Sequence, residues 1–308
     1  MPNKKTKKEG AILVAIDYSR SSKMALKEAS RISKSKGLEL FCLHVLDEEV
    51  VELFKKNNEF DKSGVMDFAK RKLDTYITQA IEDSNEVPSQ ISIGNPFVEI
   101  LKKIKTLNPS LLVMGANGHS HRYCHRAGAL ASRCVRKAPV DVMLIRRRHD
   151  GAFKSIVACV DFSENSIAAS LRAAELAEQD GAKLHLLHVY QPNLYCEPTH
   201  GFAMPDSVAS SYQFIEEDLE KYLDKITENL TEKHPNIEIT SSLKCYMAAN
   251  HGIQEQLDES GADLVVLGTR GRTGFKILLL GTTAERLIHD SPCSVYTVKP
   301  DGFSYELK

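Results

Sequence analysis

Short apolar runs alternate with amphipathic stretches along the chain. In the second half, apolar runs predict buried strands at 156–160, 183–189, 237–243, 263–267 and 293–298. Apolar residues at helical spacing predict helices at 165–179, 207–232 and 282–290, and a short helix around 254–257. Continuous apolar strands that alternate with helices are typical of a parallel sheet covered on both faces. The pattern therefore predicts a doubly wound α/β fold, whose ligands bind at the carboxyl ends of the strands.

The first half of the chain repeats the second. Residues 11–19 resemble 155–163 and residues 37–45 resemble 181–189, both at an offset of 144. Later matches, including Gly115 with Gly268, have an offset of 153, and the extra residues are expected within 190–230. Two copies of this length indicate a duplication rather than a solenoid. We predict a first domain at 1–148 and a second at 152–308, joined by a charged linker.

Composition narrows the class of protein. The 308 residues are 42% hydrophobic, and 40 Lys and Arg balance 41 Asp and Glu, which disfavours a general nucleic-acid binder. Apolar runs are too short for a transmembrane helix, and the stretch after the basic start is too short for a signal peptide. The seven cysteines form no CxxC pair, so we expect reduced thiols and a cytoplasmic protein.

A glycine pattern in the second copy lies where a ligand is expected. Gly268 and Gly271 follow a predicted strand, and after nine residues Gly281, Thr282 and Thr283 open a helix. Glycines let the backbone approach a ligand closely, and a helix N-terminus offers unpaired N–H groups to an anion. The Thr282 hydroxyl and the charge of Arg270 or Arg272 could add to this phosphate cradle. Asp161, at the end of the first strand of this copy, could accept ribose hydroxyls.

These features resemble the universal stress protein family. The Asp after the first strand, the His-Val ending the second and the G-x2-G-x9-G-[ST] spacing occur in both copies, except that Ala129 replaces the hydroxyl residue in the first. The chain thus resembles a tandem family member. The resemblance implies two five-stranded sheets of order 3-2-1-4-5, the adenine nucleotide alpha-hydrolase-like fold, and an ATP site. The residues that the resemblance assigns to this site in the second copy are Val160, Asp161, Val189, Gly268, Arg270, Gly271, Gly281, Thr282 and Thr283.

The resemblance has further implications. It implies that the two copies pair through their last strands, 140–145 and 293–298, and a homodimer of chains is plausible. Mg²⁺ could accompany the nucleotide. In the first copy the corresponding site residues are Asp17, Val45, Gly115, Gly118 and Gly128. The missing hydroxyl at Ala129 weakens that site roughly ten- to hundredfold, so the first copy is either a weaker nucleotide site or a pseudo-site kept for packing.

Other polar residues have simpler interpretations. His119, His121, Cys124 and His125 have a spacing that could supply zinc ligands, but a solvated loop over the cleft is favoured. The repeated His44 and His188 are interpreted as structural, and Ser19 and Ser163 as helix N-caps rather than nucleophiles. Cys159 and Cys293 lie in strand patterns and are expected to be buried and inert. The basic segment 146–149 is interpreted as a solvated linker rather than a nucleic-acid patch.

Three functions are compatible with this pattern. The leading hypothesis is an ATP-binding regulatory module of the stress response, with the nucleotide mainly in the second domain. A slow ATPase or nucleotide-dependent enzyme is the second, although the motif contains no clear general base. The third is a scaffold that binds a protein partner through residues 190–230, with the nucleotide as a structural part.

Overall fold

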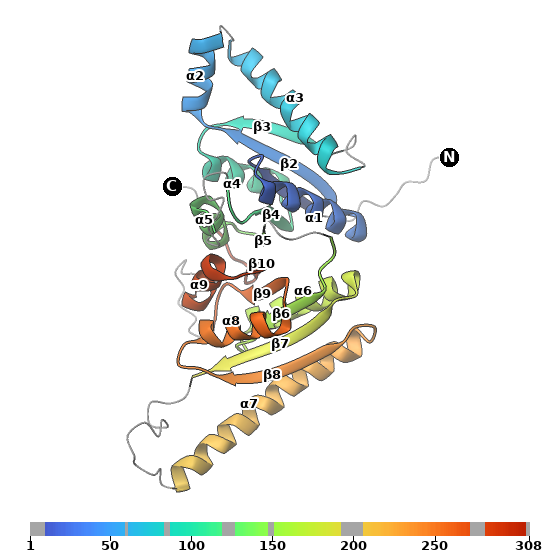
Figure 1. Ribbon diagram of the computed structural model, residues 1–308, viewed down its shortest axis with the longest axis vertical. Coiled ribbons are helices and arrows are strands. Elements are labelled where there is room, and N and C mark those ends of the chain that lie inside the picture. The colour runs from blue at the N-terminus through green and yellow to red at the C-terminus, as the bar shows by residue number, and fades with distance from the viewer. Residues whose placement is uncertain are drawn as a thin grey trace, which may run out of the picture. The chain divides into compact units, whose positions relative to one another are not determined.

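The computed structural model describes residues 10–58, 61–82, 87–118, 127–146, 151–191, 206–271 and 281–305 (Figure 1). The chain forms two compact units. Unit 1 comprises Met1–Gly151 with Ile288–Asp290 and Gly302–Lys308, and unit 2 comprises Ala152–Leu287 and Ser291–Asp301. Each unit alternates strands and helices, as the apolar pattern predicts.

Unit 1 has a parallel sheet with the strand order β3-β2-β1-β4-β5. Its strands are β1 (Ala11–Ile16), β2 (Glu39–Leu46), β3 (Ser89–Ile93), β4 (Leu111–Gly115) and β5 (Asp141–Ile145). Its helices are α1 (Arg20–Lys36), α2 (Glu48–Asn58), α3 (Lys62–Ala80), α4 (Pro96–Leu107) and α5 (Ala129–Lys137). The sequence Ala-Ile-Leu-Val-Ala-Ile of β1 lies in the middle of this sheet and is buried along nearly its whole length.

Unit 2 repeats the arrangement, with the order β8-β7-β6-β9-β10. Its strands are β6 (Ser155–Cys159), β7 (Lys183–Tyr190), β8 (Ile239–Cys245), β9 (Leu264–Gly268) and β10 (Ser294–Val298). Its helices are α6 (Glu164–Asp180), α7 (Asp206–Lys233), α8 (Ala249–Ser260) and α9 (Thr282–Asp290). Numbered within its own unit, each sheet has the order 3-2-1-4-5, so the predicted fold is confirmed.

The helix that follows the first strand begins and ends in the same way in both units. Ser19 and Ser163 accept hydrogen bonds from the backbone N–H groups of Ser22 and Ser166, which confirms both as N-caps. Gly37 and Gly181 end these helices in the left-handed conformation, with φ of 65° and 66°. Such C-caps favour glycine because a Cβ is strained there.

One helix and one residue differ from the sequence-based expectation. The short helix expected around 254–257 is α8, which runs for 12 residues. Its apolar side consists mainly of Ile253 and Leu257, so the sequence pattern marks only the middle of the helix. Arg146, assigned to a solvated linker, is 7% exposed and thus buried. No helix in the described part of the chain is long and apolar enough to span a membrane.

Candidate functional site

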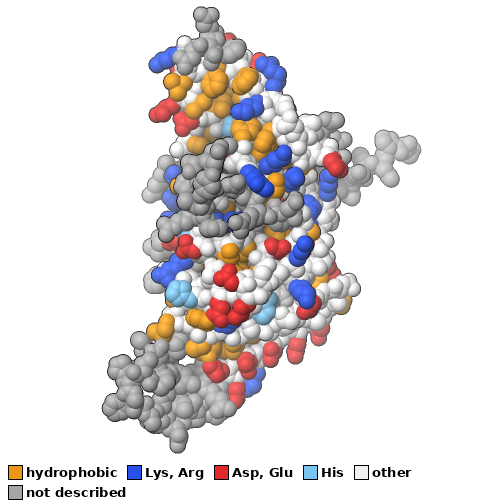
Figure 2. Space-filling model, in the orientation of Figure 1, with side chains coloured by type: hydrophobic (Ala, Val, Ile, Leu, Met, Phe, Trp, Pro, Cys, Tyr) orange, Lys and Arg blue, Asp and Glu red, His pale blue; other side chains and the backbone are white. Residues whose placement is uncertain are grey.

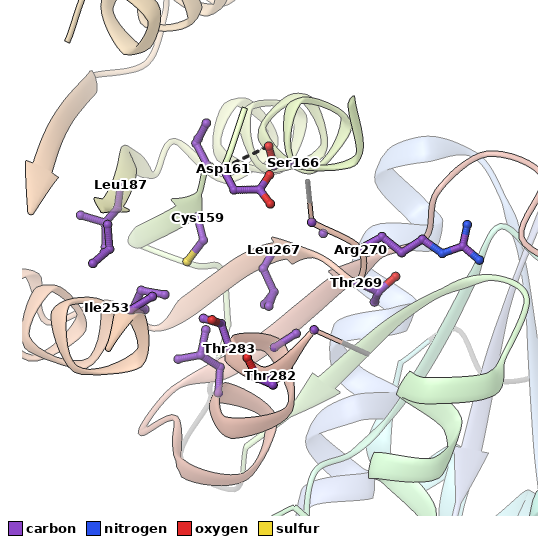
Figure 3. A pocket seen from close by; sticks show the side chains of 18 residues that line it. Cys159, Asp161, Ser166, Leu187, Ile253, Leu267, Thr269, Arg270, Thr282 and Thr283 are labelled. Carbon is purple, nitrogen blue, oxygen red and sulfur yellow. Dashed lines mark hydrogen bonds between the residues drawn. The ribbon is translucent and has the colours of Figure 1, made fainter. Parts of the chain in front are cut away.

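A cavity of about 400 Å³ opens in unit 2 at the carboxyl ends of β6, β7 and β9. The starts of α8 and α9 complete its lining. Figure 3 shows that the cavity has an apolar and a polar part. Leu187, Ile253 and Cys159 cluster in the apolar part, and the polar groups of Asp161, Thr282 and Thr283 line the rest. Its volume lies within the roughly 300–1,000 Å³ that is typical of small-molecule sites.

Every residue that the resemblance assigned to the site in the second copy lines this cavity. They come from four separate stretches of the chain, which the parallel sheet brings to one edge. These residues are Val160, Asp161, Val189, Gly268, Arg270, Gly271, Gly281, Thr282 and Thr283. The fold therefore places them together, and which ligand they bind is a separate question.

Asp161 is held in place by the residues on either side of it. The preceding carbonyl, of Val160, lies 2.6 Å from Nδ1 of the buried His188. The following residue, Phe162, has a φ of 62° and packs its ring 4.4 Å from the His188 ring, centroid to centroid. One carboxylate oxygen, Oδ1, accepts hydrogen bonds from the backbone N–H and the hydroxyl of Ser163. The histidine thus has a structural role, as expected, and the second oxygen of Asp161 accepts no hydrogen bond from a described residue.

The loop after β9 packs closely against the Asp161 carboxylate. A Cβ on Gly271 would lie 2.6 Å from Oδ2 of Asp161, and one on Gly268 would lie 2.8 Å from Oδ1 of Asn165. Asn165 is buried, accepts a hydrogen bond from the backbone N–H of Arg270 at 3.0 Å and donates one to the carbonyl of Val298 at 3.1 Å. Packing therefore requires glycine at 268, where a Cβ would meet backbone as well as side-chain atoms of Asn165, whereas a Cβ at 271 would push aside the end of the Asp161 side chain.

Gly281 is different because packing among the described residues does not require glycine there. A Cβ there would meet no described atom within 4 Å, and its φ of −57° suits any residue. Gly281 is the N-cap of α9, and no described side chain caps this helix. In contrast, Ser163 caps α6. The first turn of α9 therefore presents N–H groups and the positive end of its dipole to the cavity.

The apolar wall contains residues that the sequence did not identify as part of the site. Ala249 and Ile253 come from α8, and Leu187 and Leu267 from the sheet. Gly252 lets α8 approach β7, since a Cβ there would lie 2.9 Å from the Val189 side chain. The four-residue spacing of Ile253 and Leu257 indicated a helix, but not that the helix forms a cavity wall.

Cys159 also lines the cavity, although it was expected to be fully buried in a strand. It ends β6 and is only partly shielded from solvent. Burial raises the pKa of its thiol to about 12, so the thiol is protonated at neutral pH. The expected lack of reactivity therefore agrees with its surroundings, while its position makes it part of the candidate site.

Arg270 lines the cavity, but its side chain does not add charge as the sequence suggested. In Figure 3 it extends away from Asp161 and from the two threonines of α9. The alternative, Arg272, lies outside the described residues. Backbone N–H groups, rather than an arginine, are thus the main positive feature of the described cradle.

Unit 1 contains the same framework with different details. The ring nitrogen Nδ1 of His44 lies 2.7 Å from the carbonyl of Ile16, and Ser19 donates its backbone N–H to Asp17 at 2.9 Å. A Cβ on Gly118 would lie 3.1 Å from Asp17. Gly128 is the N-cap of α5, again without a side-chain cap. Ala129 opens that helix, so the first cradle keeps its shape but lacks the hydroxyl.

The remaining candidate site residues of unit 1 lie at strand ends near Asp17 or fall outside the described residues. Gly115 ends β4 and packs against Ser21 and Ser22, while Val45 lies near the end of β2. The possible zinc ligands His119, His121, Cys124 and His125 fall outside the described residues. Among the described residues, no group of three or more His, Cys, Asp or Glu could hold a metal ion.

Comparison with known proteins identifies the family. The model of the universal stress protein family matches residues 10–146 and again residues 152–299. The chain belongs to the universal stress protein family. Because the model matches twice, this is a tandem member, as the internal repeat predicts.

Individual relatives agree with this assignment. Universal stress protein E of Photorhabdus laumondii is 25% identical over 96% of this chain and 97% of its own length. A universal stress protein of Methanocaldococcus jannaschii is 29% identical over 50% of this chain and 87% of its own length. The crystal structure of one from Archaeoglobus fulgidus covers 94% of this chain and 98% of its own, with 20% identity and a TM-score of 0.59. The last comparison shows a shared fold.

Proposed function

We propose that unit 2 binds ATP or a related adenine nucleotide, and that the protein is a nucleotide-binding regulatory module of the stress response. The observation that supports this most directly is Gly281. It lines the cavity, packing among the described residues does not require glycine there, and it opens an uncapped helix. Close approach of a phosphate group would explain all three features.

The rest of the cavity suits the other parts of a nucleotide. The apolar wall formed by Val160, Val189 and Ile253 is suited to a flat base, because burial of its faces removes apolar surface from water. Asp161 lines the same cavity, and no described residue donates a hydrogen bond to its Oδ2, so this oxygen can accept ribose hydroxyls. One family member has been solved in complex with cAMP, but at a TM-score of 0.34 that match adds no support here.

The cavity favours binding over hydrolysis. Asp161 is the one carboxylate among the described residues that line it, and its Oδ1 already accepts two hydrogen bonds from Ser163. A general base must reach the attacking water, and a carboxylate occupied with ribose cannot do so. We therefore expect at most slow turnover of bound ATP.

The test is a titration of nucleotide-free protein with ATP, with and without Mg²⁺, by calorimetry. Mass spectrometry of the denatured protein as purified would identify any ligand already bound. Wild type should bind ATP, and Gly281→Val should lose that binding because a branched side chain would crowd the position where a phosphate group would approach the start of α9. Gly128→Val, the matched change in unit 1, should leave it intact. Absence of ATP binding by the emptied wild-type protein would overturn the proposal.

A further inference from the structure

A second hollow, of about 420 Å³, lies in unit 1 along one face of α3. Its lining combines Tyr18, directly after β1, with a stripe of α3 from Phe68 to Gln79. The stripe positions recur every three or four residues, so they share one face of the helix. None of these residues belongs to the nucleotide cavity of unit 2. We refer to this hollow as the α3 groove.

Aromatic rings form a large part of the α3 groove. The rings of Tyr18 and Tyr76 meet edge to face with centroids 5.2 Å apart. Tyr76 is fixed by its hydroxyl, which donates a hydrogen bond to the carbonyl of Ser19 at 3.2 Å. Phe68 is 48% exposed, which is unusual for so large an apolar side chain. The groove therefore offers partly fixed aromatic surface to a flat ligand.

Two cations border this aromatic surface, and neither has a carboxylate partner among the residues that the structure describes. The ammonium group of Lys72 lies 4.6 Å from the centre of the Tyr18 ring. In the described part of the chain, neither Lys72 nor Arg71 forms an ion pair, whereas Lys70 on another face of α3 pairs with Asp74 at 2.5 Å. Figure 2 shows hydrophobic and basic side chains side by side over this part of unit 1. The local charge of the groove is thus positive.

The groove also contains an unused hydrogen-bond donor. The Tyr18 hydroxyl is buried and has no partner among the described residues. Burial raises its pKa to about 12, so it keeps its proton at neutral pH. A buried polar group without a partner is costly, and such groups often belong to sites that a ligand or water completes.

We propose that the α3 groove binds a small, flat anion, with its ring against Tyr18 and Phe68 and its charge near Arg71 and Lys72. The recognising chemistry is an aromatic surface beside two cations that form no ion pair among the described residues, which matches a small aromatic carboxylate or sulfonate. The site does not depend on the nucleotide proposed for unit 2.

The test compares two fluorescent dyes that differ in one charged group. 8-Anilinonaphthalene-1-sulfonate carries a negative charge, and N-phenyl-1-naphthylamine has the same rings without it. Both are titrated into the full chain with saturating ATP. The sulfonate should bind more tightly than the neutral dye. Lys72→Gln and Arg71→Gln should each weaken it about three- to tenfold, as the loss of a charge-assisted contact predicts.

Matched variants separate charge from shape. Lys72→Arg should keep the affinity for the sulfonate, and Lys225→Gln, which removes an exposed cation from α7, should not change it. Unchanged circular dichroism would show that each variant is folded. Unaltered sulfonate affinity in the Lys72→Gln, Arg71→Gln double variant would overturn the proposal. Equal binding of both dyes, or much weaker binding of the sulfonate with saturating ATP than without it, would do so too, and ATP binding itself is measured separately.

Discussion

At the scale of single residues, the motif glycines of unit 2 serve two different purposes. Gly271 leaves room for a protein group, since a Cβ there would lie 2.6 Å from Asp161. Gly281 has no described neighbour within 4 Å of a Cβ, so its space is open to a ligand. Glycine at 271 is thus explained by contact with a protein group, and glycine at 281 by the proposed approach of a ligand.

This difference predicts opposite results for two alanine substitutions. Gly271→Ala should destabilise the protein by about 1–3 kcal/mol, because the added methyl group forces the loop and Asp161 apart. Gly281→Ala should cost less than about 1 kcal/mol in stability, as an N-cap change does, yet weaken ATP binding. Urea denaturation and calorimetric titration measure the two effects. Equal losses of stability in the two variants would contradict this interpretation.

His44, whose ring contacts the carbonyl directly before Asp17, predicts a pH dependence of stability. Desolvation lowers the pKa of His44 below its ordinary value of 6.5. The unfolded chain then binds a proton more readily than the folded one, so stability is retained above about pH 6.5 and falls as the pH drops below it. His185, whose pKa is lowered mainly by burial, adds to the same trend.

His44→Gln should therefore reduce the slope of unfolding free energy against pH between about 7 and 5. The side-chain amide can still meet the carbonyl of Ile16 but takes up no proton. A single group can contribute at most about 1.4 kcal/mol per pH unit. Denaturation at several pH values gives the slope, and identical slopes in variant and wild type would show that His44 does not titrate in this window.

At the scale of elements, helices differ in whether a side chain caps their N-terminus. Ser19, Asn95 and Ser163 cap α1, α4 and α6 with their side chains. Both α5 and α9, which open at the third motif glycine, lack such a cap in the described residues. The first turns of these two helices differ at several positions, and at the first of them Ala129 stands where Thr282 supplies the motif hydroxyl. The sequences are Ala129-Leu130-Ala131-Ser132 and Thr282-Thr283-Ala284-Glu285.

Substitutions at Thr282 and Ala129 should change the affinity of the two units for nucleotide in opposite directions. Thr282→Ala should weaken ATP binding in unit 2 about tenfold, which corresponds to the loss of one hydrogen bond to a charged group. Ala129→Thr should strengthen binding in unit 1. Calorimetric stoichiometry and affinity measure both effects. If Ala129→Thr leaves the number of bound nucleotides and their affinity unchanged, another feature of unit 1 controls its occupancy.

The sequence predicted the elements better than it predicted the walls of the site. Period-two and period-3.6 patterns are local, so β6, α6 and α9 were located within a residue or two. The motif glycines and Asp161 were found because close backbone approach and strand ends restrict residue type. Ile253 was missed because its role depends on how α8 packs on β7. The direction of the Arg270 side chain was missed for the same reason, since sequence does not fix a long side chain.

At the scale of the whole molecule, duplication has produced two units with one framework and different cradles. The Asp, His and N-cap Ser are present in both units, and their contacts are nearly the same. The contacts behind the loop differ at one pair of equivalent positions: Asn165 accepts a hydrogen bond from the backbone N–H of Arg270, whereas Ser21 donates its hydroxyl to the carbonyl of Asn117. The framework therefore maintains the fold, and the differences are where the functions of the units can diverge.

The difference between the two cradles predicts which backbone amides ATP should protect from hydrogen exchange. A ligand that binds only the native state stabilises it by about 2.7 kcal/mol at a hundredfold excess over its dissociation constant. If unit 2 is the main site, hydrogen exchange should slow in β9 and α9 and change little in β4 and α5, which serve as internal controls. Mass spectrometry of peptides from each region can resolve this. Equal protection in both units would assign a nucleotide to each cradle, and protection in unit 1 alone would contradict the assignment to unit 2.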